Sequence, residues 1–207
     1  PQAVPHARQA WSAFSTAYRE YPFGMLTLYF SPHLTGPANL FYAQPTGYSA
    51  TMVGLPYDDL ARWHGSYPPE VLAAQFHKVA DGWSLGLDAM ERAVQQATPH
   101  QRATARGDLQ LAKTCQLHFA SAANHVDFIL ARDALAADDL TPTARKEKQA
   151  FIRRILADEI SNAQELYVLA KQDSRIGFEA SNHYFYVPLD LAEKVINCHW
   201  IAESFAD

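Results

Sequence analysis

The chain has 207 residues, of which 48% are hydrophobic, and this allows one large domain with a sizeable core. Its formal net charge of −5 argues against a nucleic-acid-binding protein, because such proteins present a basic face. No apolar run is long enough to cross a bilayer, and no secretory signal is present.

The first 67 residues carry signals for helices and for long aromatic loops. A helix is predicted over about residues 5–20, because apolar side chains recur there at helical spacing. The apolar run from Gly24 to Phe30 fits a short strand or a buried extended segment. Turn residues alternate with aromatic residues after it, and this composition favours burial over disorder. A short helix is expected over Asp58–His64.

Four helices are predicted after Pro68, where apolar stripes become long and regular. The first is expected to span roughly thirty residues. Thr98-Pro99 with Gln101 matches a capping box with proline at the first helical position, and this second helix should end near Ala136. The third is expected to open at Thr141-Pro142, and the last near Pro188, with apolar positions at Leu191, Val195, Ile196 and Cys198.

Short links between long helices force antiparallel neighbours. The sequence therefore predicts an all-α fold in a single domain of residues 1–207. Residues 68–207 should form an antiparallel up-and-down bundle of long helices. The loop-rich aromatic region 1–67 should pack on that bundle.

Several polar residues fall on stripes that should face the core. Glu159 lies on the stripe of the third long helix, where a carboxylate must be paired or neutral. His118 and His125 share a face of the preceding helix. We expect hydrogen-bonded core residues here, because the chain has neither Glu-x-x-His nor Cys-x-x-Cys, and we predict no metal or other cofactor. Cys115 and Cys198 are expected to be buried free thiols, with a disulfide as the alternative.

The segment 173–188 is too rich in functional side chains for a plain connection between helices. Glu179 and His183 could form a carboxylate–imidazole pair, while Tyr184 and Tyr186 could offer hydroxyls or stacking faces. The alternative is a structural lock, in which aromatic rings close one end of the bundle and Glu179 and Asn182 cap helix termini.

The loops before residue 67 form a second candidate surface, because aromatic residues are interleaved there with amides and carboxylates. Aromatic faces can cover the C–H face of a sugar while polar groups fix its hydroxyls. The alternatives are aromatic packing over the bundle and helix capping by Asp58 and Asp59. The two surfaces are expected to meet. Together they give these substrate-binding candidates: Tyr48, Tyr57, Asp58, Trp63, Glu179, Asn182, His183, Tyr184 and Tyr186.

Several stretches of the chain resemble a known group of proteins. They are WSAFS at 11–15, YPF at 21–23, GPANL at 36–40, PTGY at 45–48, GLPYDDL at 54–60 and RIGFEASNHYFY at 175–186. Together they resemble the C-terminal, largely helical region of large bacterial glycoside-hydrolase-like proteins, over most of the chain. This resemblance implies a carbohydrate context and an accessory role, with the catalysis in an upstream barrel. No catalytic residue is carried over with it.

The leading hypothesis is therefore an accessory helical domain of a carbohydrate-active enzyme, which lines a substrate cleft or holds domains or subunits together and is not catalytic alone. The expected partners are a carbohydrate ligand and an upstream catalytic domain of the same polypeptide, and a homo-oligomer is compatible with this role. Nucleic acid and membrane are not expected partners. The chain begins with Pro1 instead of Met, which predicts a processed protein or a piece of a longer one.

Two alternatives stay open. One is an autonomous helical enzyme or ligand-binding protein that uses Glu179, His183 and Asp58. The other is a purely structural interaction module. A secreted or periplasmic location would follow from the carbohydrate interpretation alone.

Overall fold

The structure is a computed structural model that describes residues 2–30, 35–47, 58–179 and 183–206, and it confirms the predicted all-α fold. Its elements, in chain order, are α1 (Ala3–Tyr18), α2 (Met25–Phe30), the 3-10 helix η2 (Gly36–Ala38), α3 (Leu60–Trp63), α4 (Pro69–Gln96), α5 (Arg102–Leu135), α6 (Pro142–Gln172), β1 (Phe178–Glu179), β2 (His183–Tyr184) and α7 (Pro188–Glu203).

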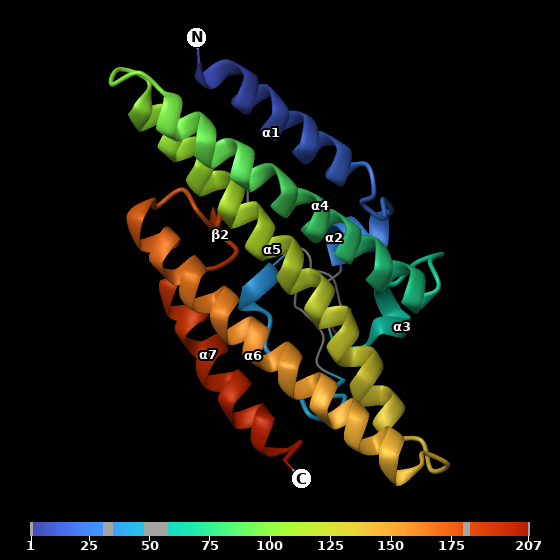
Figure 1. The fold of residues 1–207 in the computed structure, drawn as a ribbon. Helices are drawn as coiled ribbons and strands as arrows, with labels where there is room; N and C mark the ends of the chain where they lie inside the picture. The colour runs from blue at the N-terminus through green and yellow to red at the C-terminus, as the bar shows by residue number, and fades with distance from the viewer. Residues whose placement is uncertain (1, 31–34, 48–57, 180–182, 207) are drawn as a thin grey trace.

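The long helices lie side by side in the order α1, α4, α5, α6, α7 (Figure 1). Each packs on the next, and the successive helices α4 to α7 run antiparallel. The outer helices are α1, which packs on α4, and α7, which packs on α6 and η2. The arrangement is thus a row of helices with an edge helix on each side.

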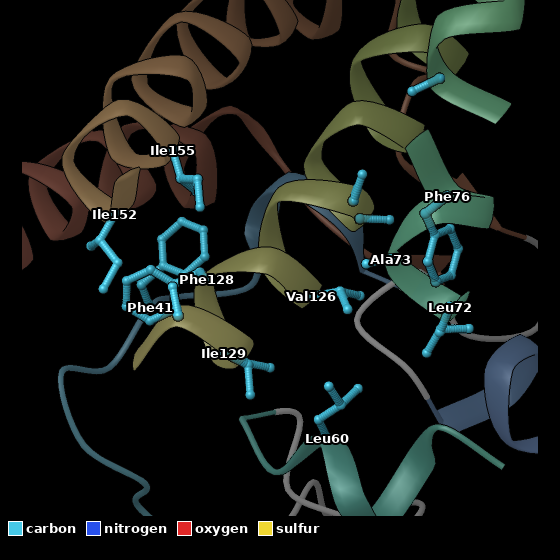
Figure 2. Close-up of a cluster of buried hydrophobic side chains, with 14 of the residues drawn as sticks. Phe41, Leu60, Leu72, Ala73, Phe76, Val126, Phe128, Ile129, Ile152 and Ile155 are labelled. Carbon is cyan, nitrogen blue, oxygen red and sulfur yellow. The ribbon is translucent and has the colours of Figure 1, made fainter. Parts of the chain in front are cut away.

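The N-terminal elements cover part of this row. η2 contacts α5, α6 and α7, while α3 contacts α2 and α5. Phe41 follows η2 and packs its ring 4.4 Å from the ring of Phe128 on α5, beside Ile152 and Ile155 of α6 (Figure 2). The main core cluster therefore joins residues of the first 67 positions to the four long helices α4, α5, α6 and α7.

Two glycines of α4 allow α1 to approach closely. A Cβ on Gly86 would collide with the ring of Phe14, and a Cβ on Gly82 would come within 2.9 Å of the Cβ of Ala17. Phe14 stacks on Trp83 with 4.6 Å between ring centroids. Because Gly82 and Gly86 are four residues apart, they lie on one face of α4 and form the groove that receives α1.

Helix signals that depend on local periodicity are confirmed. The long helices start and end within a few residues of their predicted limits. At the start of α6, the hydroxyl of Thr141 accepts a hydrogen bond from the backbone N–H of Ala144, at 3.2 Å, as an N-cap should.

Two local predictions are wrong. Residues 25–30 form helix α2 and not a strand, because a short apolar run does not distinguish the two by periodicity. The predicted capping box at Thr98 does not form, and helix α5 begins at Arg102. The backbone carbonyl of Thr98 accepts from the N–H groups of Gln101 and Arg102 in a turn that precedes the helix. The hydroxyl of Thr98 bonds the side chain of Gln101 and does not cap the helix. The predicted last helix is present as α7, which buries Leu191 and Cys198 and leaves Ile196 69% exposed.

Candidate functional site

Two segments that carry the resemblance, far apart in the sequence, meet on α5. Gly36, at φ +49°, lies so close to His118 that an added Cβ would stand 2.5 Å from the imidazole ring. The ring centroids of His118 and Tyr186 are 6.4 Å apart. Leu117, the residue before His118, belongs to the same buried cluster as Tyr186, and Ala38 packs against that cluster. The side chains of α5 thus hold both segments at one place.

The β1–β2 hairpin leads into Tyr186 and fixes its backbone. Gly177 has φ +82°, and an added Cβ would collide with the carbonyl oxygen of Tyr186. The hairpin pairs Phe178 with Tyr184 and Glu179 with His183. Directly opposite residues of an antiparallel pair have neighbouring Cβ atoms. The backbone register therefore places residue 179 opposite residue 183. The carboxylate–imidazole pair stays a prediction.

Glu159 of α6 is the centre of a buried polar network. Its side chain has no exposed surface. Oε2 accepts from Ser121 Oγ at 2.7 Å and lies 3.3 Å from Lys194 Nζ of α7. Oε1 accepts from Asn124 Nδ2 at 2.9 Å and from Asn162 Nδ2 at 3.0 Å. This confirms that the carboxylate on the core-facing stripe is paired.

Lys194 joins this network to the N-terminal stretch. Its side chain is also fully buried, and its ammonium group donates to the backbone oxygen of Asn39. The same group stands 3.8 Å above the centroid of the Phe41 ring, a cation–π contact. One turn along α7, Asn197 Nδ2 donates to the carbonyl of Phe41 at 3.0 Å, and Asn197 Oδ1 accepts from the Phe41 N–H at 2.8 Å.

The network has the properties of a structural fastening. A carboxylate has about four lone-pair positions, and Glu159 contacts donors on α5, α6 and α7. A buried pair of this kind is costly to break, because removal of one partner leaves the other charge without compensation in a medium of low polarity. Glu159 and Lys194 therefore fix α7 and residues 39–41 to the row of helices.

A second buried pair anchors the stretch before α3. Arg132 of α5 and Asp58 are both about 95% buried or more, with 3.7 Å between Nη1 and Oδ2. Arg132 Nη2 donates to the backbone oxygen of Asp58 at 2.7 Å. Asp58 Oδ2 also accepts from the backbone N–H and the hydroxyl of Thr46, at 2.8 and 3.1 Å. Asp58 thus ties residue 46 to the start of α3 from a buried position.

A polar groove of about 260 Å³ runs between α4, α5 and α6. Asn124 and Asn162, which bond Glu159, line it, so the groove adjoins the buried network. At this groove, His77 Nε2 lies 2.7 Å from Asp127 Oδ2. The hydrogen bond to the carboxylate of Asp127 raises the pKa of His77 above its usual value, against the opposing effect of burial.

The outer face of α7 exposes three large apolar side chains among polar ones, which are Glu193, His199 and Glu203. Leu189, Ile196 and Trp200 are 75%, 69% and 64% exposed and lie on one side of the helix. Next to them a groove of about 450 Å³ between α6 and α7 is lined by Ala163, Val195 and other mainly apolar residues. We call Leu189, Ile196, Trp200 and this groove the α7 outer face. Several large apolar side chains exposed on one helix face, next to an apolar groove, are typical of a surface that binds a partner.

The sequence-predicted candidates fall in different environments. Trp63 has no exposed surface and belongs to the main core cluster, where it has no face to offer a ligand. Tyr186 is 4% exposed, and burial raises the pKa of its phenol. Asp59 is the N-cap residue of α3 but makes no side-chain cap hydrogen bond there. Tyr48, Tyr57 and Asn182 lie outside the described residues, and so do the side chains of Glu179, His183 and Tyr184.

Lys194, Asn197 and His77 were not predicted as site residues. Lys194 stands in the buried stripe Leu191, Lys194, Cys198 and Ile201 of α7. A lysine at such a position, opposite a helix with a glutamate in its own stripe, is a signal for a buried pair. No comparable signal marked Asn197 or His77, because their partners, the backbone of Phe41 and the side chain of Asp127, are distant in the sequence.

The two cysteines are free, as the sequence predicted. Burial raises the pKa of Cys115 to about 11 and that of Cys198 to about 12, so neither is an activated thiolate. Within the described residues, no three His, Cys, Asp or Glu side chains gather in a way that could hold a metal ion. Among these residues, no helix is long and apolar enough to span a membrane.

Comparison with known proteins gives no family assignment. No protein-family model matches it, and no curated protein or solved structure gives a significant match.

Proposed function

We propose that the chain is an accessory helical domain of a carbohydrate-active enzyme, which associates with the catalytic domain of the same polypeptide and is not catalytic alone. The observation that carries this proposal is the orientation of α7. Its inner side includes a buried lysine, while isoleucine and tryptophan face outward at 69% and 64% exposure. An outer face of this kind is explained when another protein surface covers it.

The polar chemistry also supports an accessory role. Glu159 pairs with Lys194 and Asp58 with Arg132, and these side chains also bind the backbone of Asn39, Thr46 and Asp58. Groups engaged in this way stabilise a fold and are not poised for proton transfer to a ligand. The carbohydrate context comes from the resemblance of residues 175–186 and of the N-terminal stretches.

The first test is the coding sequence on both sides of the chain. An upstream stretch with the alternating βα pattern of a barrel is expected. If the flanking sequence instead encodes an unrelated pattern or begins just before Pro1, the accessory role is refuted.

The second test measures association. The chain and the upstream domain are produced separately and titrated against each other by calorimetry. Ile196→Asp should weaken association by about tenfold or more, because a carboxylate must be desolvated in the interface. Leu85→Asp on α4 is the matched control, since Leu85 is 75% exposed, and it should leave association unchanged.

Two results would contradict the proposal. One is equal association of the wild type and the Ile196→Asp variant. The other is a dimer of the chain, detected by sedimentation, that Ile196→Asp dissociates, since the α7 outer face would then bind a second copy.

A further inference from the structure

A hollow of about 330 Å³ lies at the other edge of the row, between α1, the end of α4 and the start of α5. One side of it is apolar and includes Trp11, Met90 and Ala93. The other side carries His100, Gln101 and Asp108. The hollow is thus divided into an aromatic and aliphatic wall and a polar rim.

Trp11 is suited to bind a flat ligand surface. Half of its surface is exposed, whereas Trp63 is completely buried and Trp83 is used in the seam between α1 and α4. Phe14 meets Trp11 edge-on, with 5.8 Å between ring centroids and 89° between ring planes. Phe14 is itself only 1% exposed, so the contact that orients the Trp11 ring is anchored in the core.

The polar rim comes from one local segment. His100 and Gln101 belong to the turn before α5, and Asp108 lies in its second turn. Thr104 also lines the hollow, four residues before Asp108 and therefore on the same face of α5. The rim combines an imidazole, an amide, a hydroxyl and a carboxylate, which can both donate and accept hydrogen bonds.

We propose that this hollow binds one pyranose unit of an oligosaccharide. The ring of Trp11 would cover the C–H face of the sugar, and His100, Gln101 and Asp108 would bind its hydroxyls. The volume lies at the lower end of the range of ligand pockets, about 300–1,000 Å³, which fits one sugar unit better than a longer chain. The proposal deepens the proposed function and rests on its carbohydrate context.

The contrast with the α7 outer face supports a sugar over a protein partner. The groove beside α7 is lined almost entirely by apolar atoms, and the core of a protein interface is similarly apolar. The hollow beside Trp11 offers polar groups on one side only, as an amphipathic sugar ring requires. A phosphate or carboxylate ligand is disfavoured, because Asp108 would repel it.

The test is a titration of the chain with neutral disaccharides that differ in sugar and linkage: cellobiose, xylobiose, maltose, mannobiose and chitobiose. Tryptophan fluorescence and calorimetry follow binding. At least one disaccharide should give a saturable change. Trp11→Ala should weaken its binding about tenfold, because stacking contacts and buried area are lost together.

Two further variants separate the hollow from other surfaces. Asp108→Asn should weaken binding severalfold without altering the apolar wall. Trp200→Ala is the matched control, since Trp200 is also exposed but lies on α7, and it should leave the affinity within about twofold of the wild type. Circular dichroism confirms that each variant is folded.

The proposal is overturned if none of the disaccharides gives a saturable signal, or if folded Trp11→Ala binds as the wild type does. These outcomes leave the association of the α7 outer face with the upstream domain untouched, because that is measured by a different titration and a different variant. Conversely, if the chain does not associate with the upstream domain, the sugar titration still tests the hollow, because it uses the chain alone.

Discussion

The two edge helices are attached to the row in different ways. α1 is held by apolar packing: Ala10, Phe14 and Ala17 are buried, and Phe14 fits against the glycines of α4. α7 is held partly by polar groups, since Lys194 and Asn197 bind Glu159 and the backbone of residues 39–41. An apolar seam tolerates small shifts of the helix, whereas a hydrogen-bonded seam fixes its register.

The difference also extends to the outward faces. α1 exposes Trp11 beside a hollow with a polar rim, whereas α7 exposes Leu189, Ile196 and Trp200 beside an apolar groove. One edge therefore suits a small amphipathic ligand and the other a protein surface. Helix α7 shows that the buried side of an edge helix need not be its most apolar side.

The largest expected effect is at the polar seam. Lys194→Met leaves the carboxylate of Glu159 buried without its cation, and we expect a loss of about 3–5 kcal/mol in the free energy of unfolding. Urea denaturation measures this. The double variant Lys194→Met, Glu159→Gln removes the buried charge and should recover part of the loss. A loss below about 1 kcal/mol in the single variant would mean that the pair does not hold α7 in place.

At the apolar seam, Phe14→Ala should destabilise the protein by about 3 kcal/mol, because it leaves a cavity between α1 and α4. Thermal unfolding provides the measurement. The exposed Val4→Ala on the same helix is the control and should change stability by less than about 0.5 kcal/mol. If both variants are equally stable, α1 is attached by something other than the Phe14 contact.

The same seam can be tested by overpacking. Gly86→Ala places a Cβ against the Phe14 ring, and we expect a loss of about 1–3 kcal/mol despite the better helix propensity of alanine. Gly107→Ala on α5 is the matched control, because nothing lies within 4 Å of its added Cβ. That variant should be neutral or stabilising in the same urea titration. A stabilised Gly86→Ala would show that α1 can move outward at no cost.

These seams explain what the sequence could predict. The extents of α4 and α6 and the end of α5 follow from local apolar periodicity, and Thr141 marks the start of α6 by a local hydrogen bond. α7 was only partly predictable. Its apolar residues fit more than one stripe, so the sequence does not show which side of α7 is buried. The buried side is the one that carries Lys194, because Lys194 pairs with Glu159 on another helix.

The candidate site shows the same division. The position of Glu159 on an apolar stripe predicted that it must be paired, and it is. Its partner could not be predicted, because a helix sequence does not show which lysine will be covered by a distant segment. The meeting of Gly36 with His118 likewise depends on packing between segments separated by most of a hundred residues.

The smallest expected effect concerns a charged pair in an open groove. The hydrogen bond to Asp127 raises the pKa of His77 above its unfolded value of about 6.5. Its stabilisation is therefore fully present below about pH 6.5 and is lost as the pH rises through the raised pKa. The His77 side chain is 41% exposed, so the effect should stay below about 1 kcal/mol.

An NMR titration of the His77 ring, with unfolding measured at both ends of the titration, checks this dependence. His77→Gln should remove this part of the pH dependence. A His77 that titrates below its unfolded value would show that burial outweighs the hydrogen bond.

The double hydrogen bond between Asn197 and the backbone of Phe41 also constrains the order of events during synthesis. The two residues are 156 positions apart, so the N-terminal stretch leaves the ribosome long before its final partner exists. The row α4 to α6 can form first from contacts between neighbours in the chain, whereas residues 39–41 can be locked only after α7 has been made. Translation that stops before Lys194 should therefore leave residues 39–41 undocked, whereas α1 can still pack on α4.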